Sequence, residues 1–254
     1  MSMKPLKIWV AGPKELLDHA FDHLSKRQPF DFRIAMISVD NAVELAIKTY
    51  LTLPKRARGT DGPSLKKFQE ASSSFSDLLD LLEEFAGTKL TGIDLADVEV
   101  YHRLRNTLYH DGNGVTVDPE YVDGYLQIAR VLLNNLLGVS VEKDEANPPT
   151  SSVGDLVLKW AILVDKIRTV QHKSMGEPVP PNEPALHTVD RLVSRGILDS
   201  HFRKRLKTAN AYRNKLVHGV SIPISEENVA DVATILNELI TEINEKYIFR
   251  YNVN

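Results

Sequence analysis

Apolar residues recur along this chain at intervals of three and four, the spacing that places them on one face of an α-helix. In the first part of the chain this pattern predicts helices over residues 13–24, 32–53 and 65–86. Pro13 suits the first turn of the first helix, Pro54 ends the second and Gly87 ends the third. Patterns typical of strands are scarce, so the sequence predicts an all-α protein.

The helical spacing continues through the rest of the chain. Residues 95–110 predict a fourth helix, and Asp118 followed by Pro119 is typical of the start of a fifth, which runs to residue 137. The stretch 139–152 is charged and rich in proline, and it can neither bury apolar surface nor hold a helix. We therefore expect two helical domains, 1–138 and 153–254, joined by a linker at 139–152. The helices expected in the second domain cover 153–174, 186–195, 199–218 and 225–247.

Two short segments of the chain nearly repeat one another. One reads Arg-Asn-Thr-Leu-Tyr-His at 105–110, and the other reads Arg-Asn-Lys-Leu-Val-His at 213–218. Both have asparagine after arginine, leucine two residues before histidine, and a glycine shortly after the histidine. One such match would be common by chance, but two with the same neighbours indicate an internal repeat.

Paired helical units that carry an Arg-Asn-x-x-x-His motif resemble the HEPN superfamily, whose members are small four- or five-helix bundles. The resemblance covers about residues 32–138 and 153–248. It implies two tandem HEPN-like bundles and a metal-independent endoribonuclease that works in stress response or antiphage defence. The residues that it implies as catalytic are Arg105, His110, Arg213 and His218, with Asn106 and Asn214 in support.

The implied reaction suits these side chains. The ribose 2′-hydroxyl attacks the adjacent phosphate, histidine moves a proton near neutral pH, and arginine offsets the charge that builds on the phosphate. No cofactor or metal ion is needed. Residues five apart on a straight helix are separated by about 140° around its axis, so Arg105 and His110 do not converge on one point. We therefore expect the two halves to pack as a pseudo-twofold pair, with both motifs lining one groove.

The charge balance restricts how the chain can meet RNA. Lysine and arginine total 31 against 34 aspartate and glutamate, a formal net charge of -3, so any contact with RNA has to be local. Two short basic stretches are candidates for this contact, and a solvated surface is the alternative interpretation of each. They comprise Lys55, Arg56 and Arg58 in a turn-rich loop, and Arg203, Lys204 and Lys207 on the second motif helix.

Three features of the sequence bear on where the protein works. It has no cysteine, no apolar run of the length that spans a membrane, and no long apolar stretch at its start. Together they predict a cytoplasmic protein that does not enter a membrane.

Two other classes of protein fit the same motifs. One is a non-catalytic RNA- or nucleotide-binding module that scaffolds a partner, and the other is a regulatory adaptor that keeps only the fold. An arginine and a histidine near a helix end can also simply bond its last carbonyls.

Candidate partners besides RNA are a protein regulator or antitoxin and a second copy of the chain. The HEPN toxins that pair with a nucleotidyltransferase antitoxin often carry a tyrosine two residues after the motif histidine. Here those positions are Gly112 and Val220, which weakens the interpretation as a toxin of that kind.

Overall fold

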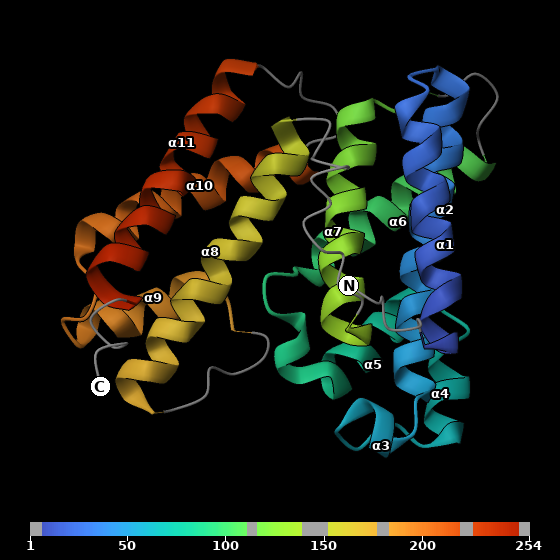
Figure 1. Ribbon diagram of the computed structural model, residues 1–254, viewed down its shortest axis with the longest axis horizontal. Helices are drawn as coiled ribbons and strands as arrows, with labels where there is room; N and C mark the ends of the chain where they lie inside the picture. The colour runs from blue at the N-terminus through green and yellow to red at the C-terminus, as the bar shows by residue number, and fades with distance from the viewer. Residues whose placement is uncertain (1–6, 111–115, 139–151, 177–182, 219–225, 249–254) are drawn as a thin grey trace, which may run out of the picture.

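The computed structural model describes residues 7–110, 116–138, 152–176, 183–218 and 226–248, and every regular element in these ranges is a helix (Figure 1). The predicted all-α class is therefore confirmed for the described residues. None of their helices combines the length and the apolar character needed to cross a membrane. The first half contains α1 (Ile8–Ser25), α2 (Pro29–Thr52), α3 (Lys55–Arg58), α4 (Leu65–Ala71), α5 (Phe75–Ala86), the 3-10 turn η1 (Gly87–Leu90), α6 (Leu95–His110) and α7 (Pro119–Leu137). The second half contains α8 (Ser152–Met175), α9 (Ala185–Ser194), α10 (Ser200–His218), α11 (Glu226–Ile243) and the π-helical turn η2 (Asn244–Ile248).

The helices α6 and α7 have the bounds that the sequence indicates. The Asp118 carboxylate accepts a hydrogen bond from the backbone N–H of Glu120 at 3.0 Å, which starts α7. Gly138 ends this helix in the left-handed conformation, with φ at 64°. Local capping signals therefore fix both ends of α7.

Two predicted helices differ from the observed ones. Because α1 begins at Ile8, Pro13 lies inside the helix and not at its start, and Val10 before it is buried. The single helix expected over 65–86 is the pair α4 and α5. Ser74 starts the second of these, because its hydroxyl accepts a hydrogen bond from the backbone N–H of Asp77 at 3.4 Å. Apolar spacing continues on both sides of this break, so periodicity alone does not reveal it.

Five helices form a row through the molecule. α2 packs against α1 and α7, α7 packs against α8, and α8 packs against α11. Small and β-branched side chains line the buried faces of α2, including Ala35, Val39, Ala42 and Ala46, none of which is exposed. Such side chains allow the neighbouring helices to pack closely.

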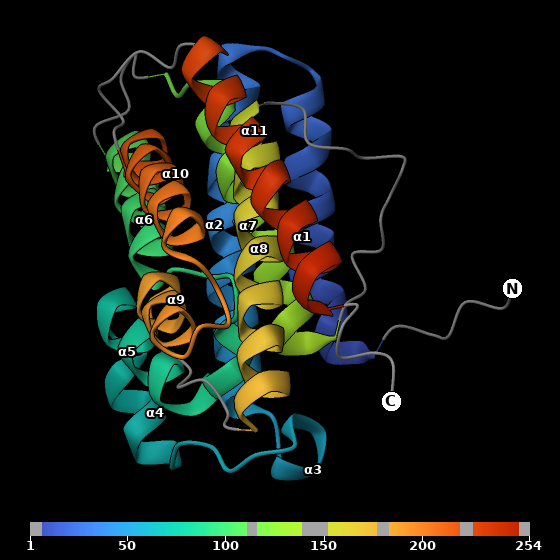
Figure 2. The ribbon, with the colours of Figure 1, turned by 90° about the vertical axis from the view of Figure 1, so that its left-hand side faces the viewer.

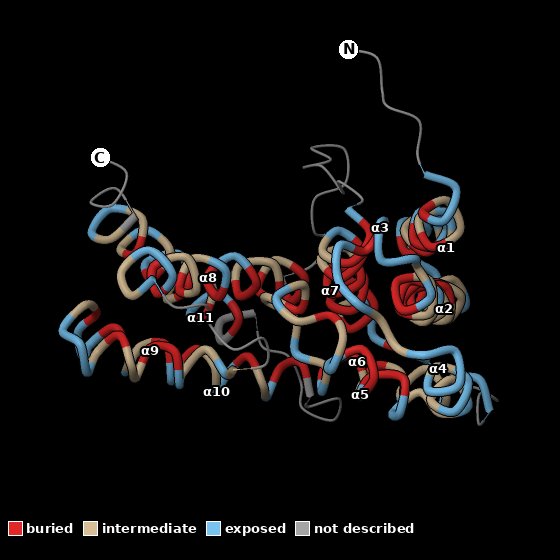
Figure 3. The backbone as a smooth tube through the Cα atoms, turned by 90° about the horizontal axis from the view of Figure 1, so that it is seen from below, coloured by how far each residue is buried: buried red, intermediate tan, exposed pale blue. Residues whose placement is uncertain are grey.

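The two motif helices, α6 and α10, lie beside this row in a second layer. Figures 2 and 3 show α4, α5, α6, α9 and α10 on one side of the row. Phe202 and Leu206 of α10 are buried in one cluster with apolar residues of α8 and α11. The row therefore supports both motif helices from the same side, and α6 contacts α10 within the layer.

The two halves are joined unequally. Each half has its own cluster of buried side chains, although Val157 of α8 and Val217 of α10 belong to the cluster of the first half. In the repeat, α2 corresponds to α8 and α7 corresponds to α11, so the counterpart of the large α7–α8 contact would join α2 to α11. No α2–α11 contact of similar extent occurs among the described residues. A two-fold pair would need both contacts, because it meets through equivalent surfaces. The contact between the halves is therefore unequal, and the predicted pseudo-twofold packing is not confirmed.

Candidate functional site

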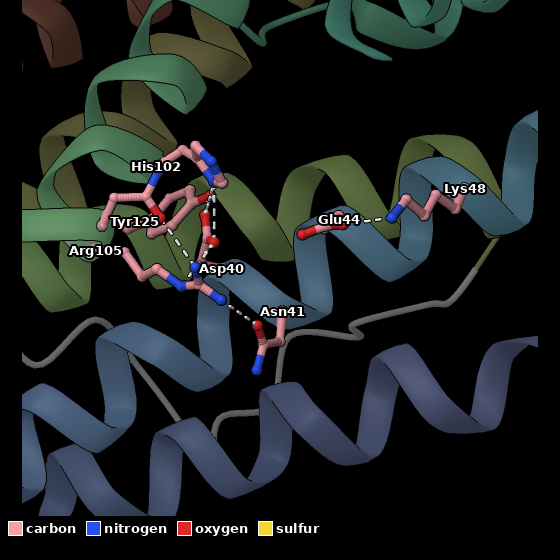
Figure 4. A network of polar contacts seen from close by, with 8 residues as sticks. Asp40, Asn41, Glu44, Lys48, His102, Arg105 and Tyr125 are labelled. Atoms are coloured by element: carbon pink, nitrogen blue, oxygen red, sulfur yellow. Dashed lines mark hydrogen bonds and ion pairs between the residues drawn. The ribbon is translucent and has the colours of Figure 1, made fainter. Parts of the chain in front are cut away.

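A buried carboxylate on α2 holds Arg105 of the first motif. The Nε atom of Arg105 lies 3.3 Å from Oδ2 of Asp40, whose side chain has no exposed surface. One outer nitrogen of Arg105 donates to the side-chain oxygen of Asn41 at 3.0 Å (Figure 4). The other donates to the side-chain oxygen of Asn106 at 2.9 Å. The guanidinium is therefore fixed by α2 on one side and by its own helix on the other.

Asp40 also receives two further donors. Nδ1 of His102 lies 3.0 Å from Oδ2 of Asp40, and the hydroxyl of Tyr125 donates to Oδ1 at 2.8 Å. Phe75 stacks on the His102 ring, with the two centroids 3.7 Å apart. Burial, followed by the charge of Asp40, raises the pKa of Tyr125 well above its usual value, so the phenol keeps its proton and remains a donor. These partners compensate the lost hydration of a buried carboxylate.

The end of α6 presents both side chains of the first motif to solvent. The Arg105 side chain is 19% exposed, and a guanidinium carries more N–H donors than its three partners use. His110 is the last residue of the helix and is exposed, with its ring in edge contact with Tyr109 at a centroid distance of 5.2 Å. A fixed cation and an accessible imidazole are suited to phosphate binding and proton transfer.

Arg213 of the second motif has a different setting. Its side chain is 3% exposed and donates to both carboxylate oxygens of Asp97, which is 1% exposed in the first turn of α6. The Nη1–Oδ1 distance of this pair is 2.9 Å. Arg213 also donates to Asn214 at 3.2 Å, and its guanidinium lies over the ring of Trp160. A phosphate therefore cannot reach this guanidinium in the described structure.

The sequence around the repeat explains why the two arginines bind different partners. Asp97 stands eight residues before Arg105, and the corresponding position before Arg213 is Arg205. Arg205 pairs with Glu242 on α11. If Arg105 contacted α10 in the way that Arg213 contacts α6, it would lie against Arg205, and two arginines would meet. Arg105 binds Asp40 and Asn41 of α2 instead.

Sequence reasoning missed both carboxylates that hold the motif arginines. A signal for Asp40 exists, because Ile-Ser-Val-Asp at 37–40 has a counterpart in Ile-Leu-Val-Asp at 162–165. The counterpart Asp165 is exposed, and Arg213 does not pair with it. No pattern marks Asp97, because its role depends on the contact between α6 and α10.

The described parts of the two motifs lie apart. Asp97 is in the first turn of α6 and His110 is its last residue, so about 20 Å separates them along the helix axis. Arg213, which is bound to Asp97, is therefore near the opposite end of α6 from His110. The side chain of His218 lies outside the described residues. The structure joins Arg105 to Asn106 and leaves His110 at the same end of α6, and it does not add Arg213 to them.

A cavity of about 570 Å³ lies between the halves, next to the second motif. Trp160 of α8 and both Asn210 and Asn214 of α10 form part of its wall. The charged lining residues are the acids Asp80, Glu83, Asp94, Glu99 and Glu183 and a single arginine, Arg168. An excess of negative charge disfavours an RNA strand, so this cavity does not fit the expected RNA groove.

The basic stretch 55–58 forms the short helix α3. Arg58 is 9% exposed and donates to the carbonyl of Leu51 at 2.8 Å, so it bonds the end of α2 and is not free for RNA. Lys55 forms a surface ion pair with Asp61 at 2.8 Å. Arg56 is exposed. The stretch therefore offers less free positive charge than its sequence indicates.

In the basic stretch on α10, one residue is held in an ion pair and two are exposed. Arg203 pairs with Asp190 of α9, and the hydrogen bond from this arginine lowers the pKa of Asp190 below its ordinary value. Lys204 and Lys207 are exposed and have no acidic partner among the described side chains. Two of the three predicted RNA-binding residues on α10 are thus free to bind an anion.

Comparisons of the chain with protein-family models, with curated proteins and with solved structures find no match. The resemblance to the HEPN superfamily therefore depends on the repeated motif and its helical setting.

Proposed function

We propose that this protein is a metal-independent endoribonuclease of the HEPN type that uses its first motif for the reaction. The observation that carries the proposal is the anchored, partly exposed guanidinium of Arg105, which lies within two turns of the exposed His110. The anchor on Asp40 favours this role. A cation that is held in place before the substrate arrives stabilises a transition state without a further cost of ordering.

In the proposed reaction the free N–H groups of Arg105 bind the phosphate and offset the charge that it gains. The ribose 2′-oxygen attacks the phosphorus atom, and the bond from phosphorus to the 5′-oxygen of the next nucleotide breaks. The 2′-hydroxyl loses a proton and the leaving 5′-oxygen gains one; His110 carries out one of these two transfers and water carries out the other. Asn106, which accepts a hydrogen bond from Arg105 at 2.9 Å, positions the guanidinium. The products carry a 2′,3′-cyclic phosphate and a 5′-hydroxyl.

Arg105 and His110 of the same chain are not well placed to act on one phosphate. Arg105 and His110 are separated by about 140° around α6, and Arg213 is bound to Asp97. We infer that Arg105 of one chain and His110 of a second copy act on the same phosphate. A second copy of the chain, which the sequence analysis names as a candidate partner, would then be a condition of activity.

Cleavage of a mixed RNA pool in EDTA tests the proposed reaction. The native protein should leave 2′,3′-cyclic phosphate ends, and His110→Ala should lose at least about a hundredfold in rate. His187→Ala, which removes an exposed histidine from α9, is the matched control and should retain the native rate. Full activity of His110→Ala would refute the role of the first motif.

Mixing two inactive variants tests whether the site is shared between chains. Arg105→Lys keeps a positive charge for Asp40 but loses the planar fork that binds phosphate. Mixed with His110→Ala, it should recover about a quarter of the native rate, because half of the dimers regain one of two sites. No recovery from two folded variants that form mixed dimers would place the whole site within one chain.

A non-catalytic RNA-binding module is the second candidate function. The sealed ion pair of Arg213 favours it, because one implied catalytic arginine has a structural role in this chain. This function predicts that the native protein binds RNA and leaves it intact under the conditions of the cleavage assay.

A further inference from the structure

The charges of α10 all have one sign. Between Ser200 and His218 the chain has six lysines and arginines and no aspartate or glutamate. Three of the cations are neutralised by acids on other helices, namely Arg203 by Asp190, Arg205 by Glu242 and Arg213 by Asp97. The arginines of α10 therefore hold the helix in the fold, and the lysines are left for another role.

The three lysines of α10 lie on its outer face. Lys204, Lys207 and Lys215 are exposed and have no acidic partner among the described side chains. At 100° per residue they fall within an arc of about 80°, and about 16 Å separates the first from the last along the axis. Tyr212 borders the same face and is 42% exposed, with the Lys215 ammonium 5.7 Å from its ring centroid. We call these four residues the lysine face.

We propose that the lysine face binds single-stranded RNA. The lysines contact successive phosphates, and Tyr212 stacks against an unpaired base. The inference deepens the proposed function, because it names the surface that holds the strand, and it rests on the protein binding RNA either as a nuclease or as a binding module.

Charge and composition favour this occupant over others. Base stacking on an exposed aromatic ring needs an unpaired base, which a single strand offers and a duplex does not. A helix that lies in a membrane surface needs a broad apolar side, whereas Tyr212 is the only large apolar side chain of α10 that is exposed among the described residues. The acid-lined cavity adjoins α10 at Asn210 and Asn214. At 100° per residue these lie beside the Lys207 edge of the lysine face and away from Tyr212, so negative charge limits the strand on that side.

Fluorescence anisotropy with a labelled oligouridylate tests the proposal, using the full-length chain in the His110→Ala background so that the probe stays intact. The first variant is Lys204→Gln/Lys207→Gln/Lys215→Gln. The matched control is Lys14→Gln/Lys26→Gln/Lys66→Gln, which removes the same charge from three surface lysines of the first half, each of them paired with an acid. Substitutions at such exposed positions leave the fold intact, as thermal unfolding of both variants should show.

The lysine-face variant should bind the probe at least tenfold more weakly than the control at moderate salt. Its plot of log affinity against log salt should be less steep by about 2, since each phosphate contact to a single strand contributes about 0.7 to the slope. Tyr212→Ala should weaken binding at least about fivefold, and Tyr212→Phe, which keeps the stacking ring, should bind as the native residue does.

Several outcomes would overturn this proposal. They are no binding of the probe by the parent chain, equal losses in the two triple variants, and tighter binding to a duplex or to phosphatidylserine vesicles than to the single strand. Failure of the cleavage assay with specific RNA binding retained would refute the proposed nuclease and leave the lysine face in place.

Discussion

Arg213 on α10 and Asp97 on α6 form a buried ion pair across 116 positions of the sequence. The pair joins the motif helix of one half to the motif helix of the other. The arginine that looks catalytic in the sequence is thus part of the contact between the halves.

Breaking this pair should destabilise the whole protein. Arg213→Met takes the arginine charge away from the buried Asp97 carboxylate, and we expect a loss of about 3–5 kcal/mol in the free energy of unfolding. The double variant Arg213→Met/Asp97→Leu removes both charges and should recover most of this loss. Equilibrium unfolding in urea measures both values. A double variant as unstable as the single one would mean that the loss of stability comes from altered packing and not from the buried charge.

Removal of the hydroxyl group should have different effects on stability at two stacked tyrosines. The rings of Tyr101 and Tyr125 lie 4.7 Å apart, but the Tyr101 hydroxyl is buried without a hydrogen-bond partner among the described residues. Tyr125→Phe removes a donor to Asp40 and should cost about 1.5–3 kcal/mol, whereas Tyr101→Phe should cost nothing or stabilise by about 1 kcal/mol. Urea unfolding of the two variants checks this order, and the reverse order would contradict the described contacts.

The same tyrosines should make the fold sensitive to alkali. Burial first, and a neighbouring aspartate second, raises the pKa of Tyr101 and of Tyr125 above the ordinary value. Above about pH 10 the unfolded chain releases phenol protons that the native protein keeps, so the free energy of unfolding falls as pH rises. Below about pH 9 these groups contribute no pH dependence.

Unfolding midpoints in urea between pH 9 and 11 measure this effect, with the pH range set by the phenol pKa of about 10. The decline should be less steep in Tyr101→Phe than in the native protein. Tyr109→Phe, which changes a ring that is 63% exposed, is the control and should follow the native curve. An identical slope in all three proteins would show that the buried phenols do not control it.

Gly92 allows the loop before α6 to touch α8. Its φ is 78°, and a Cβ there would lie 2.9 Å from the Cα of Ala161. Gly138 has a similar φ of 64°, and no described atom lies within 4 Å of a Cβ placed there. Both alanine variants should pay about 1–2 kcal/mol for the backbone conformation, and Gly92→Ala should lose more because α8 has to move. The difference between their unfolding free energies measures the effect of the contact between Gly92 and α8. Equal losses would show that α8 moves aside without a loss of stability.

Local signals in the sequence predicted the motif helix α6 and its neighbour α7, because side-chain caps and glycines act within a few residues. They did not predict the break at Ser74, since apolar spacing is the same on both sides of it. The partners of the motif arginines were also beyond reach. Helical periodicity shows which face of a helix is apolar, but it does not specify which of several helices will cover that face.

The repeat itself suggested equal roles for Arg105 and Arg213. The substitution of Arg205 for Asp97 at corresponding positions breaks this equality. Its effect is visible only in the contact between α6 and α10. A symmetric contact would contain two arginine–aspartate pairs, and the observed contact contains only the pair of Arg213 and Asp97 among the described residues.

The row of five helices also shows how the second half depends on the first. α1 covers one side of α2, and α7 covers α8 in the same manner, so the second half has no outer helix of its own. Without the first half, Val157 on α8 would lose the apolar cluster in which it is buried. The second half is therefore a dependent module, because α7 of the first half covers a side of α8 that the described helices of the second half leave open.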